Sequence, residues 1–265
     1  MLLDNGVDLH SYQPTADDIV KISDCDLFIY VGGESDEWVE DALRNAANRN
    51  MKVINLLEVL GDSVKTEEIV EGMQEEEHEH EDAEEHEHEE EVDEHVWLSL
   101  KNAKMLVRVI SKALQELDPN NKDIYAANAD AYVKKLSALD AEYQTAVDAA
   151  SNKTILFGDR FPFRYFADAY GLDYYAAFPG CSSESEASAK TLSFLIDKIN
   201  KEQIPVVFHT ELSNEKMTDC ICEATGAKKL LLHSCHNVSK DDFENGATYL
   251  SLMEQNVAAL KEALN

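Results

Sequence analysis

The stretch from residue 120 to 150, NNKDIYAANADAYVKKLSALDAEYQTAVDAA, decides how the rest of the chain can be arranged. It contains no Gly or Pro, and its apolar positions recur at helical spacing. These positions are Tyr125, Ala129, Tyr132, Leu136, Leu139, Tyr143 and Ala146. At 1.5 Å per residue the predicted helix is about 45 Å long, which is more than a small lobe needs. We therefore expect a rigid helix that connects two lobes.

Strand and helix patterns alternate on both sides of this connector. Before it, strand patterns occur at 26–31 and 52–57, helix patterns at 14–23, 37–48 and 98–117, and residues 2–3 resemble the end of another strand. After it, strand patterns occur at 154–157, 173–178, 205–208 and 228–232, and helix patterns at 162–170, 188–201, 214–225 and 246–264. Such alternation favours parallel sheets covered by helices. The predicted fold is α/β, with two Rossmann-like lobes (1–117 and 151–265) joined by one long helix at 118–150.

Residues 75–94 form an acidic tract with twelve Glu, two Asp and four His. With so few apolar residues, the tract is expected to be a solvated, mobile loop. Imidazole among carboxylates suits zinc and neighbouring divalent metals, although most acidic runs only solvate the chain. Because acidic runs seldom contain so many histidines, we favour auxiliary metal capture by His78, His80, His86 and His88.

The composition excludes several classes of protein. A formal charge of −30 over 265 residues opposes nucleic-acid binding and favours cations. No apolar run is long enough to span a bilayer, and the first residues lack the pattern of a signal peptide. The five cysteines define no disulfide framework, and we expect buried free thiols at Cys25, Cys220 and Cys222.

Five histidines lie in loops or at the ends of predicted strands, where ligands bind in open α/β sheets: His10, His95, His209, His233 and His236. We predict that His10, His95 and His233 bind a metal. For His209 and His236 we favour ordinary hydrogen-bonded loop residues by a small margin. Glu211 could serve as a general base, but we favour a turn residue, since no HExxH motif is present.

Several motifs, in order, resemble the zinc/manganese substrate-binding receptors of ABC importers. They are DLHSYQPT, DEHVWLSL, DPNNKDIYAANADAYVKKLSALD, YFADAYGL, SEASAKTL and YLSLMEQNVAALKEAL, which together span the chain. The resemblance implies a metal held in the cleft between two lobes, with one His from the SYxPT loop and another before Trp97. The acidic, histidine-rich loop resembles that of the zinc-handling members, so Zn²⁺ is expected in preference to Mn²⁺.

Three departures from the family's pattern concern the remaining ligands and the chain start. The family's third ligand aligns with Arg160, which cannot bind a cation, so Asp159 is the substitute. The family's late Asp aligns with His233. The family also begins with a signal sequence, a strand and a helix that have no counterpart before Met1, so either the sequence is a fragment or the first lobe lacks its opening strand.

The predicted metal site is thus His10, His95, His233 and Asp159, while His209, Glu211, Cys235 and His236 remain alternatives for the third and fourth ligands. The disulfide state of Cys181 and Cys235 is also open. The resemblance implies a non-catalytic, monomeric zinc receptor outside the cytoplasmic membrane, whose partner is the membrane permease of an ABC importer. The alternative is a zinc-dependent hydrolase or a metal-storage protein that uses the same ligands.

Overall fold

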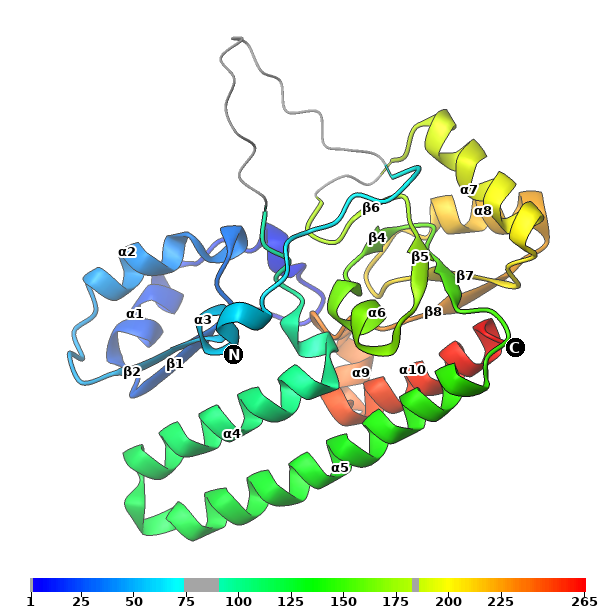
Figure 1. Ribbon diagram of the computed structural model, residues 1–265. Coiled ribbons are helices and arrows are strands. Elements are labelled where there is room, and N and C mark those ends of the chain that lie inside the picture. Colours follow the sequence, from blue (N-terminus) through cyan, green and yellow to red (C-terminus); the bar gives the residue numbers. More distant parts are fainter. Residues whose placement is uncertain (1, 74–90, 183–185) are drawn as a thin grey trace.

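The computed structural model describes residues 2–73, 91–182 and 186–265 and confirms the predicted α/β fold with a long connecting helix (Figure 1). Helix α4 (Leu100–Leu117) runs away from the centre of the molecule, and α5 (Lys122–Ala149) returns beside it. A short 3-10 turn at Pro119–Asn121 separates the two helices. Because α5 has 28 residues, it reaches from the outer end of the first lobe to the second lobe.

The first lobe contains a parallel pair of strands in which Leu27 lies opposite Lys52. Its elements are α1 (Ala16–Asp24), β1 (Leu27–Tyr30), α2 (Trp38–Arg44), β2 (Lys52–Asn55) and α3 (Leu56–Leu60). The expected strand end at residues 2–3 is wrong, since these residues are irregular. The nearby backbone is held instead by the other lobe: Gly6 N–H donates to Val238 O at 3.0 Å.

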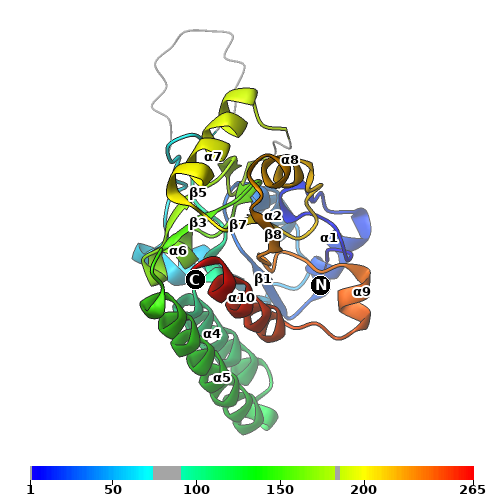
Figure 2. The same cartoon turned by 90° about the vertical axis from the view of Figure 1, so that its right-hand side faces the viewer.

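The second lobe contains parallel pairs β3–β5 and β7–β8, and a bridge between Phe157 and Phe208 links them. The strands are β3 (Thr154–Leu156), β5 (Asp173–Tyr175), β7 (Val206–His209) and β8 (Lys228–Leu231). The helices are α6 (Arg164–Tyr170), α7 (Ala189–Glu202) and α8 (Lys216–Thr225), seen at another angle in Figure 2. The sequence patterns missed the short parallel pair β4 (Arg160–Phe161) and β6 (Phe178–Pro179), and also α9 (Lys240–Glu244).

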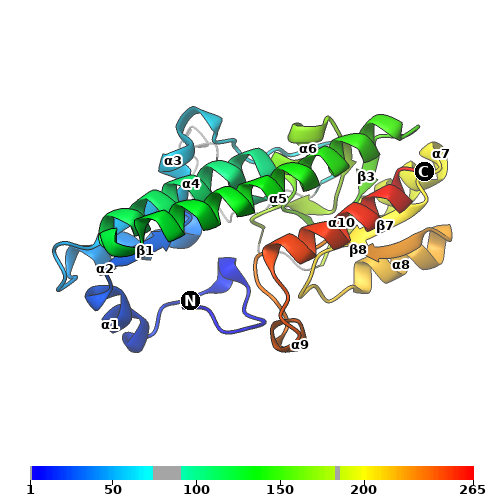
Figure 3. The same ribbon diagram turned by 90° about the horizontal axis from the view of Figure 1, so that it is seen from below.

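The last helix, α10 (Tyr249–Ala263), lies along α5 and ties the connector to the second lobe (Figure 3). Tyr143 of α5 is completely buried, and its hydroxyl donates to Met253 O at 2.5 Å. Leu136 is also completely buried in this core. The apolar stripe predicted for α5 therefore packs on α4, α10 and the second lobe.

The acidic tract ends in ordered structure. His78, His80, His86 and His88 lie outside the described residues, but Val92 bridges Thr66 in antiparallel fashion. Asp93 and Glu94 are each only 1% exposed, so the expectation of a solvated loop is wrong for these two residues. Their carboxylates are buried because they accept hydrogen bonds from His95 and Ser35, as described below.

Two sequence expectations about exposure and span can be compared with the structure. All five cysteines are free, but Cys220 is exposed and Cys25 and Cys222 are partly exposed, so the prediction of buried thiols there is wrong. On α8, Thr218 and Ile221 occupy the buried face instead. Within the described ranges, every helix is too short or too polar to cross a membrane.

Candidate metal site

His10 is presented by a 3-10 turn, Leu9–Ser11, that follows Asp8 in the first lobe. Asp8 Oδ1 accepts the His10 backbone N–H at 3.0 Å and fixes the start of this turn. Nδ1 of the His10 ring lies 2.9 Å from Ser35 Oγ and 3.5 Å from Glu94 Oε2. Nε2, on the other side of the ring, lies 3.3 Å from Nε2 of His95. The ring therefore turns Nδ1 toward polar partners and Nε2 toward another imidazole.

His95 is fully buried at the start of the 3-10 turn Val96–Leu98. Asp93 holds it twice, because Oδ1 accepts the His95 backbone N–H at 2.8 Å and lies 2.9 Å from Nδ1 of the ring. Trp97 follows, and its Nε1 donates to Ser234 O of the second lobe at 2.8 Å. The end of the acidic tract thus positions His95 and connects it to the opposite lobe.

His236 comes from the segment after β8 in the second lobe. Cys235 has a φ of 58°, a left-handed conformation that turns the chain immediately before His236. Nδ1 of His236 lies 2.8 Å from Ser234 Oγ, which itself donates to Glu211 Oε1 at 2.6 Å. The His236 ring lies 4.5 Å from the His95 ring and 5.1 Å from the His10 ring, measured between centroids.

His10, His95 and His236 form a candidate metal site, since each offers a ring nitrogen and these three atoms lie within 4.8 Å of one another. Nδ1 of every ring has a polar neighbour. Nε2 of His236 is buried with no hydrogen-bond partner among the described residues, which is costly for a polar atom. Histidine ligands usually have their second nitrogen fixed in this way, so the donor set fits zinc.

The electrostatics keep two of these imidazoles neutral. Burial lowers the pKa of His10 to about 3; the neighbouring His95 and Arg160 lower it further, and Asp8 raises it. Burial also lowers the pKa of His236 well below its usual value, and the neighbouring imidazoles and Arg160 lower it further. Neutral imidazole is the form that binds metals, so protons compete weakly at these positions.

The structure brings His10 and His95 together but places His233 and Asp159 outside the three-His group. Nδ1 of His233 accepts the Cys235 backbone N–H at 2.9 Å and lies 3.3 Å from Glu211 Oε1. Asp159 Oδ2 accepts the Thr210 hydroxyl at 2.7 Å. These two residues support loops around the site in this structure.

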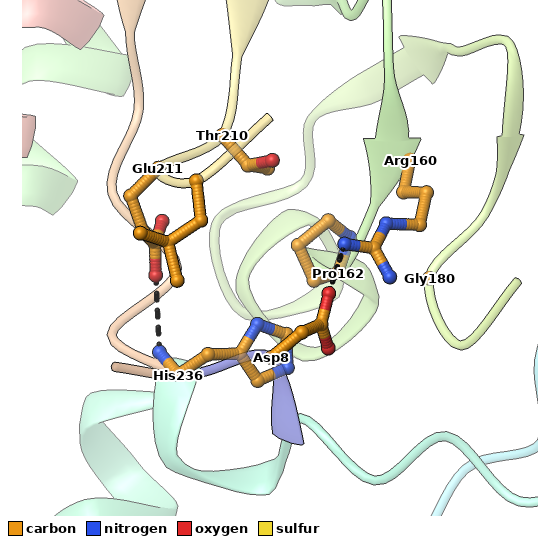
Figure 4. A pocket seen from close by; sticks show the side chains of 8 residues that line it. Asp8, Arg160, Pro162, Gly180, Thr210, Glu211 and His236 are labelled. Atoms are coloured by element: carbon orange, nitrogen blue, oxygen red, sulfur yellow. Dashed lines mark hydrogen bonds and ion pairs between the residues drawn. The ribbon is translucent and has the colours of Figure 1, made fainter. Parts of the chain in front are cut away.

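A small pocket beside His236 is lined by Asp8, Arg160 and Glu211, among others (Figure 4). Arg160, aligned with the family's third ligand, points into the pocket, and its Nη2 lies 2.6 Å from Asp8 Oδ2. Glu211 accepts the backbone N–H of His236 at 3.1 Å. Nδ1 of His209 lies 3.1 Å from Thr210 O, as in an ordinary loop contact.

Sequence reasoning therefore ranked His233 above His236, whereas the structure places His236 beside His10 and His95. The two residues are three apart in an irregular segment, where no periodicity tells which side chain faces the cleft. The left-handed conformation of Cys235 turns the chain so that His236 faces His10 and His95. The sequence indicated only that residues 233–236, HSCH, offer two imidazoles at one strand end, either of which could be a ligand.

Comparison with known proteins gives consistent matches over the whole chain. The family described as "Zinc-uptake complex component A periplasmic" (ZnuA) matches residues 1–263. The high-affinity zinc uptake system protein ZnuA of Bacillus subtilis is 34% identical over 264 residues, covering 100% of this chain and 80% of the relative. The zinc-binding lipoprotein AdcA of Streptococcus pneumoniae is 32% identical over 99% of this chain, which spans 50% of AdcA.

Solved structures also match nearly the whole chain. The Zn(II)-bound ZnuA-like domain of Streptococcus pneumoniae AdcA has a TM-score of 0.76 and 28% identity, covering 99% of this chain and 89% of that domain. The metal-dependent lipoprotein YcdH of Bacillus subtilis has a TM-score of 0.79 and 28% identity, with the same two coverages.

Proposed function

This chain belongs to the zinc-uptake complex component A (ZnuA) family, and we propose from this premise that it is a high-affinity receptor that delivers Zn²⁺ to an ABC importer. The zinc ion is its substrate. We propose His10, His95 and His236 as protein ligands, with His236 taking the place first given to His233. Asp159 is then a supporting residue, held by Thr210.

The observation that carries this proposal is the convergence of three imidazoles from both lobes. His10 and His95 come from the first lobe and His236 from the second, and their ligand atoms lie within 4.8 Å of one another. A metal bound to all three would hold the lobes together. Three nitrogens leave one coordination position to be completed, as zinc prefers four ligands.

The alternative of a zinc hydrolase is not supported, because the family consists of binding proteins, as expected for a non-catalytic receptor. Glu211, the candidate base, accepts hydrogen bonds from Ser234 through both carboxylate oxygens, at 2.6 Å each. A metal-storage role would require many equivalents of metal. The three-His group offers one position.

The expected setting and partner follow from the family. We propose that the receptor acts outside the cytoplasmic membrane, as the periplasmic and lipoprotein relatives do, and that its partner is the membrane permease of the importer. We further propose that it acts as a monomer. The histidines of the tract, His78, His80, His86 and His88, would capture zinc as weaker auxiliary sites.

A competition titration tests this function. Purified metal-free protein is titrated with Zn²⁺ and with Mn²⁺ at equal free concentrations against a chromophoric chelator. We expect one tight equivalent of zinc and weaker binding of manganese, because three imidazoles suit zinc better than the harder manganese ion. Tighter binding of manganese, or a tight zinc equivalent that survives in His95→Ala, would contradict the proposal.

A further inference from the structure

A second group of possible metal ligands lies beside the His10 ring: His10, Glu94 and Cys181, whose ligand atoms lie within 4.8 Å of one another. Glu94 Oε2 is 3.5 Å from Nδ1 of His10, whereas Nε2 of the same ring is 3.3 Å from His95. The two nitrogens of one imidazole thus face two different groups. We propose that His10 Nδ1, the Glu94 carboxylate and the Cys181 sulfur form a second position for a divalent, thiophilic cation.

Glu94 is positioned like a ligand that lacks its ion. Its Oε1 accepts the Ser35 backbone N–H at 2.9 Å, while Oε2 is buried with no hydrogen-bond partner among the described residues. Gly33 makes room for this carboxylate: it has a φ of 83°, and a Cβ there would overlap the Glu94 side chain. A buried carboxylate oxygen without a donor is costly, and a bound cation would satisfy it.

Cys181 supplies the sulfur from the second lobe. Glu67 Oε1 accepts its backbone N–H at 2.7 Å. Burial raises the pKa of the Cys181 thiol, and the negative charges of Glu67, Asp93 and Glu94 raise it further. A cation would bind the sulfur as thiolate, with the thiol proton released to solvent, and the combination of N, O and S ligands suits zinc rather than calcium or magnesium.

The two positions share His10 and so exclude each other. A metal on Nε2 leaves the ring proton on Nδ1, where Ser35 Oγ at 2.9 Å can accept it. A metal on Nδ1 leaves the proton on Nε2, which faces His95. An ion at the second position is therefore one imidazole away from the three-His site. This inference rests on the proposed function for the identity of the metal.

Cobalt(II) tests the inference, because thiolate ligation gives a near-ultraviolet charge-transfer band that imidazole and carboxylate do not give. In wild-type protein under reducing conditions, the first equivalent of Co²⁺ should fill the three-His site without this band. His236→Ala removes a ligand of that site but none of the second, so the band should appear. Residues 74–90 contain no Cys, so the acidic tract cannot produce it.

Matched double variants identify the sulfur. His236→Ala with Cys181→Ser should lose the band, whereas His236→Ala with Cys235→Ser should retain it. Circular dichroism tests whether each variant folds. If His236→Ala does not fold, His95→Ala provides an independent way to remove the three-His site. Folded variants without the band, a band that survives Cys181→Ser, or one that disappears with Cys235→Ser would each overturn the inference. Wild-type protein that binds no zinc would instead overturn the proposed function.

Discussion

The two lobes hold their metal-site histidines in different ways. In the first lobe, carboxylates of neighbouring residues act directly on the rings: Asp93 lies 2.9 Å from His95 Nδ1, and Glu94 lies 3.5 Å from His10 Nδ1. In the second lobe, Glu211 accepts the His236 backbone N–H directly but reaches the His236 ring through the hydroxyl of Ser234. The first lobe thus orients its ligands with buried charges, whereas the second uses a neutral link and a left-handed turn.

This difference indicates where the site is preorganised. A direct carboxylate fixes the tautomer and increases the basicity of the ring, while a hydroxyl fixes the orientation with less charge. The first lobe also supplies two of the three imidazoles. We therefore expect it to form most of the zinc site before the second lobe adds His236.

The largest expected effect separates His236 from His233. His236→Ala should weaken zinc binding by more than about 100-fold, because it removes a metal ligand. Loss of a residue that only supports a ligand costs about 10- to 100-fold. His233→Ala is the matched control and should change zinc affinity far less. Chelator competition measures both. The reverse order would restore His233 as the ligand.

The next effect compares the two kinds of support. Asp93→Asn should weaken zinc binding by about 10- to 100-fold, because it removes the charge behind His95. Ser234→Ala should cost about 10-fold, at the lower end of the same range, because the group behind His236 is neutral. Isothermal calorimetry gives both values. Equal losses would mean that Glu211, acting through the Ser234 hydroxyl, affects His236 as strongly as Asp93 affects His95.

A pH series distinguishes the tight site from the acidic tract. The pKa of His10 is about 3 in the folded protein, so the neutral ligand persists as pH falls, whereas histidines with an ordinary pKa near 6.5 protonate below about pH 6. Calorimetry at pH 7 and pH 5 should show loss of the weaker zinc equivalents and retention of the tight one. Deletion of residues 75–91 should remove the weaker equivalents at pH 7. Loss of the tight site on deletion would make the tract the main site.

The same lowered pKa predicts how metal-free protein responds to acid. Below about pH 6.5 the unfolded chain binds a proton at His10 that the folded state refuses until about pH 3. Stability should therefore fall as pH decreases through this window. Thermal unfolding of metal-free wild type and His10→Gln checks this, and the variant should show a smaller decrease. An identical pH dependence in both proteins would exclude His10 as the cause.

The smallest effect concerns one of several ion pairs between the lobes. Asp8 and Arg160 meet at 2.6 Å but remain partly exposed, so Arg160→Gln should cost no more than about 1 kcal/mol of the free energy of unfolding. Urea denaturation measures it, with Arg164→Gln as the control at another partly exposed pair, Arg164–Glu68. A loss of several kcal/mol would show that Arg160 is essential to the contact between the lobes.

The sequence by itself determined most of the order of helices and strands and the long connector, and it singled out His10 and His95, which the structure places together. Helical spacing over α5 is a local property, and the later part of its apolar stripe, including Leu136 and Tyr143, is buried as that spacing predicts. His95 was marked by its place between an acidic tract and an apolar pattern. Motif resemblance added the family and its metal.

Only the tertiary structure decided which histidine of the second lobe lies beside His10 and His95 and how the end of the acidic tract is held. The choice between His233 and His236 depends on one left-handed residue, Cys235, which no spacing rule reveals. Asp93 and Glu94 look like two more charges of a solvated run, but long-range contacts, of Asp93 with Lys65 and of Glu94 with Ser35, hold them in buried positions. Local patterns fix secondary structure, whereas burial of a charge depends on partners that only the folded chain brings together.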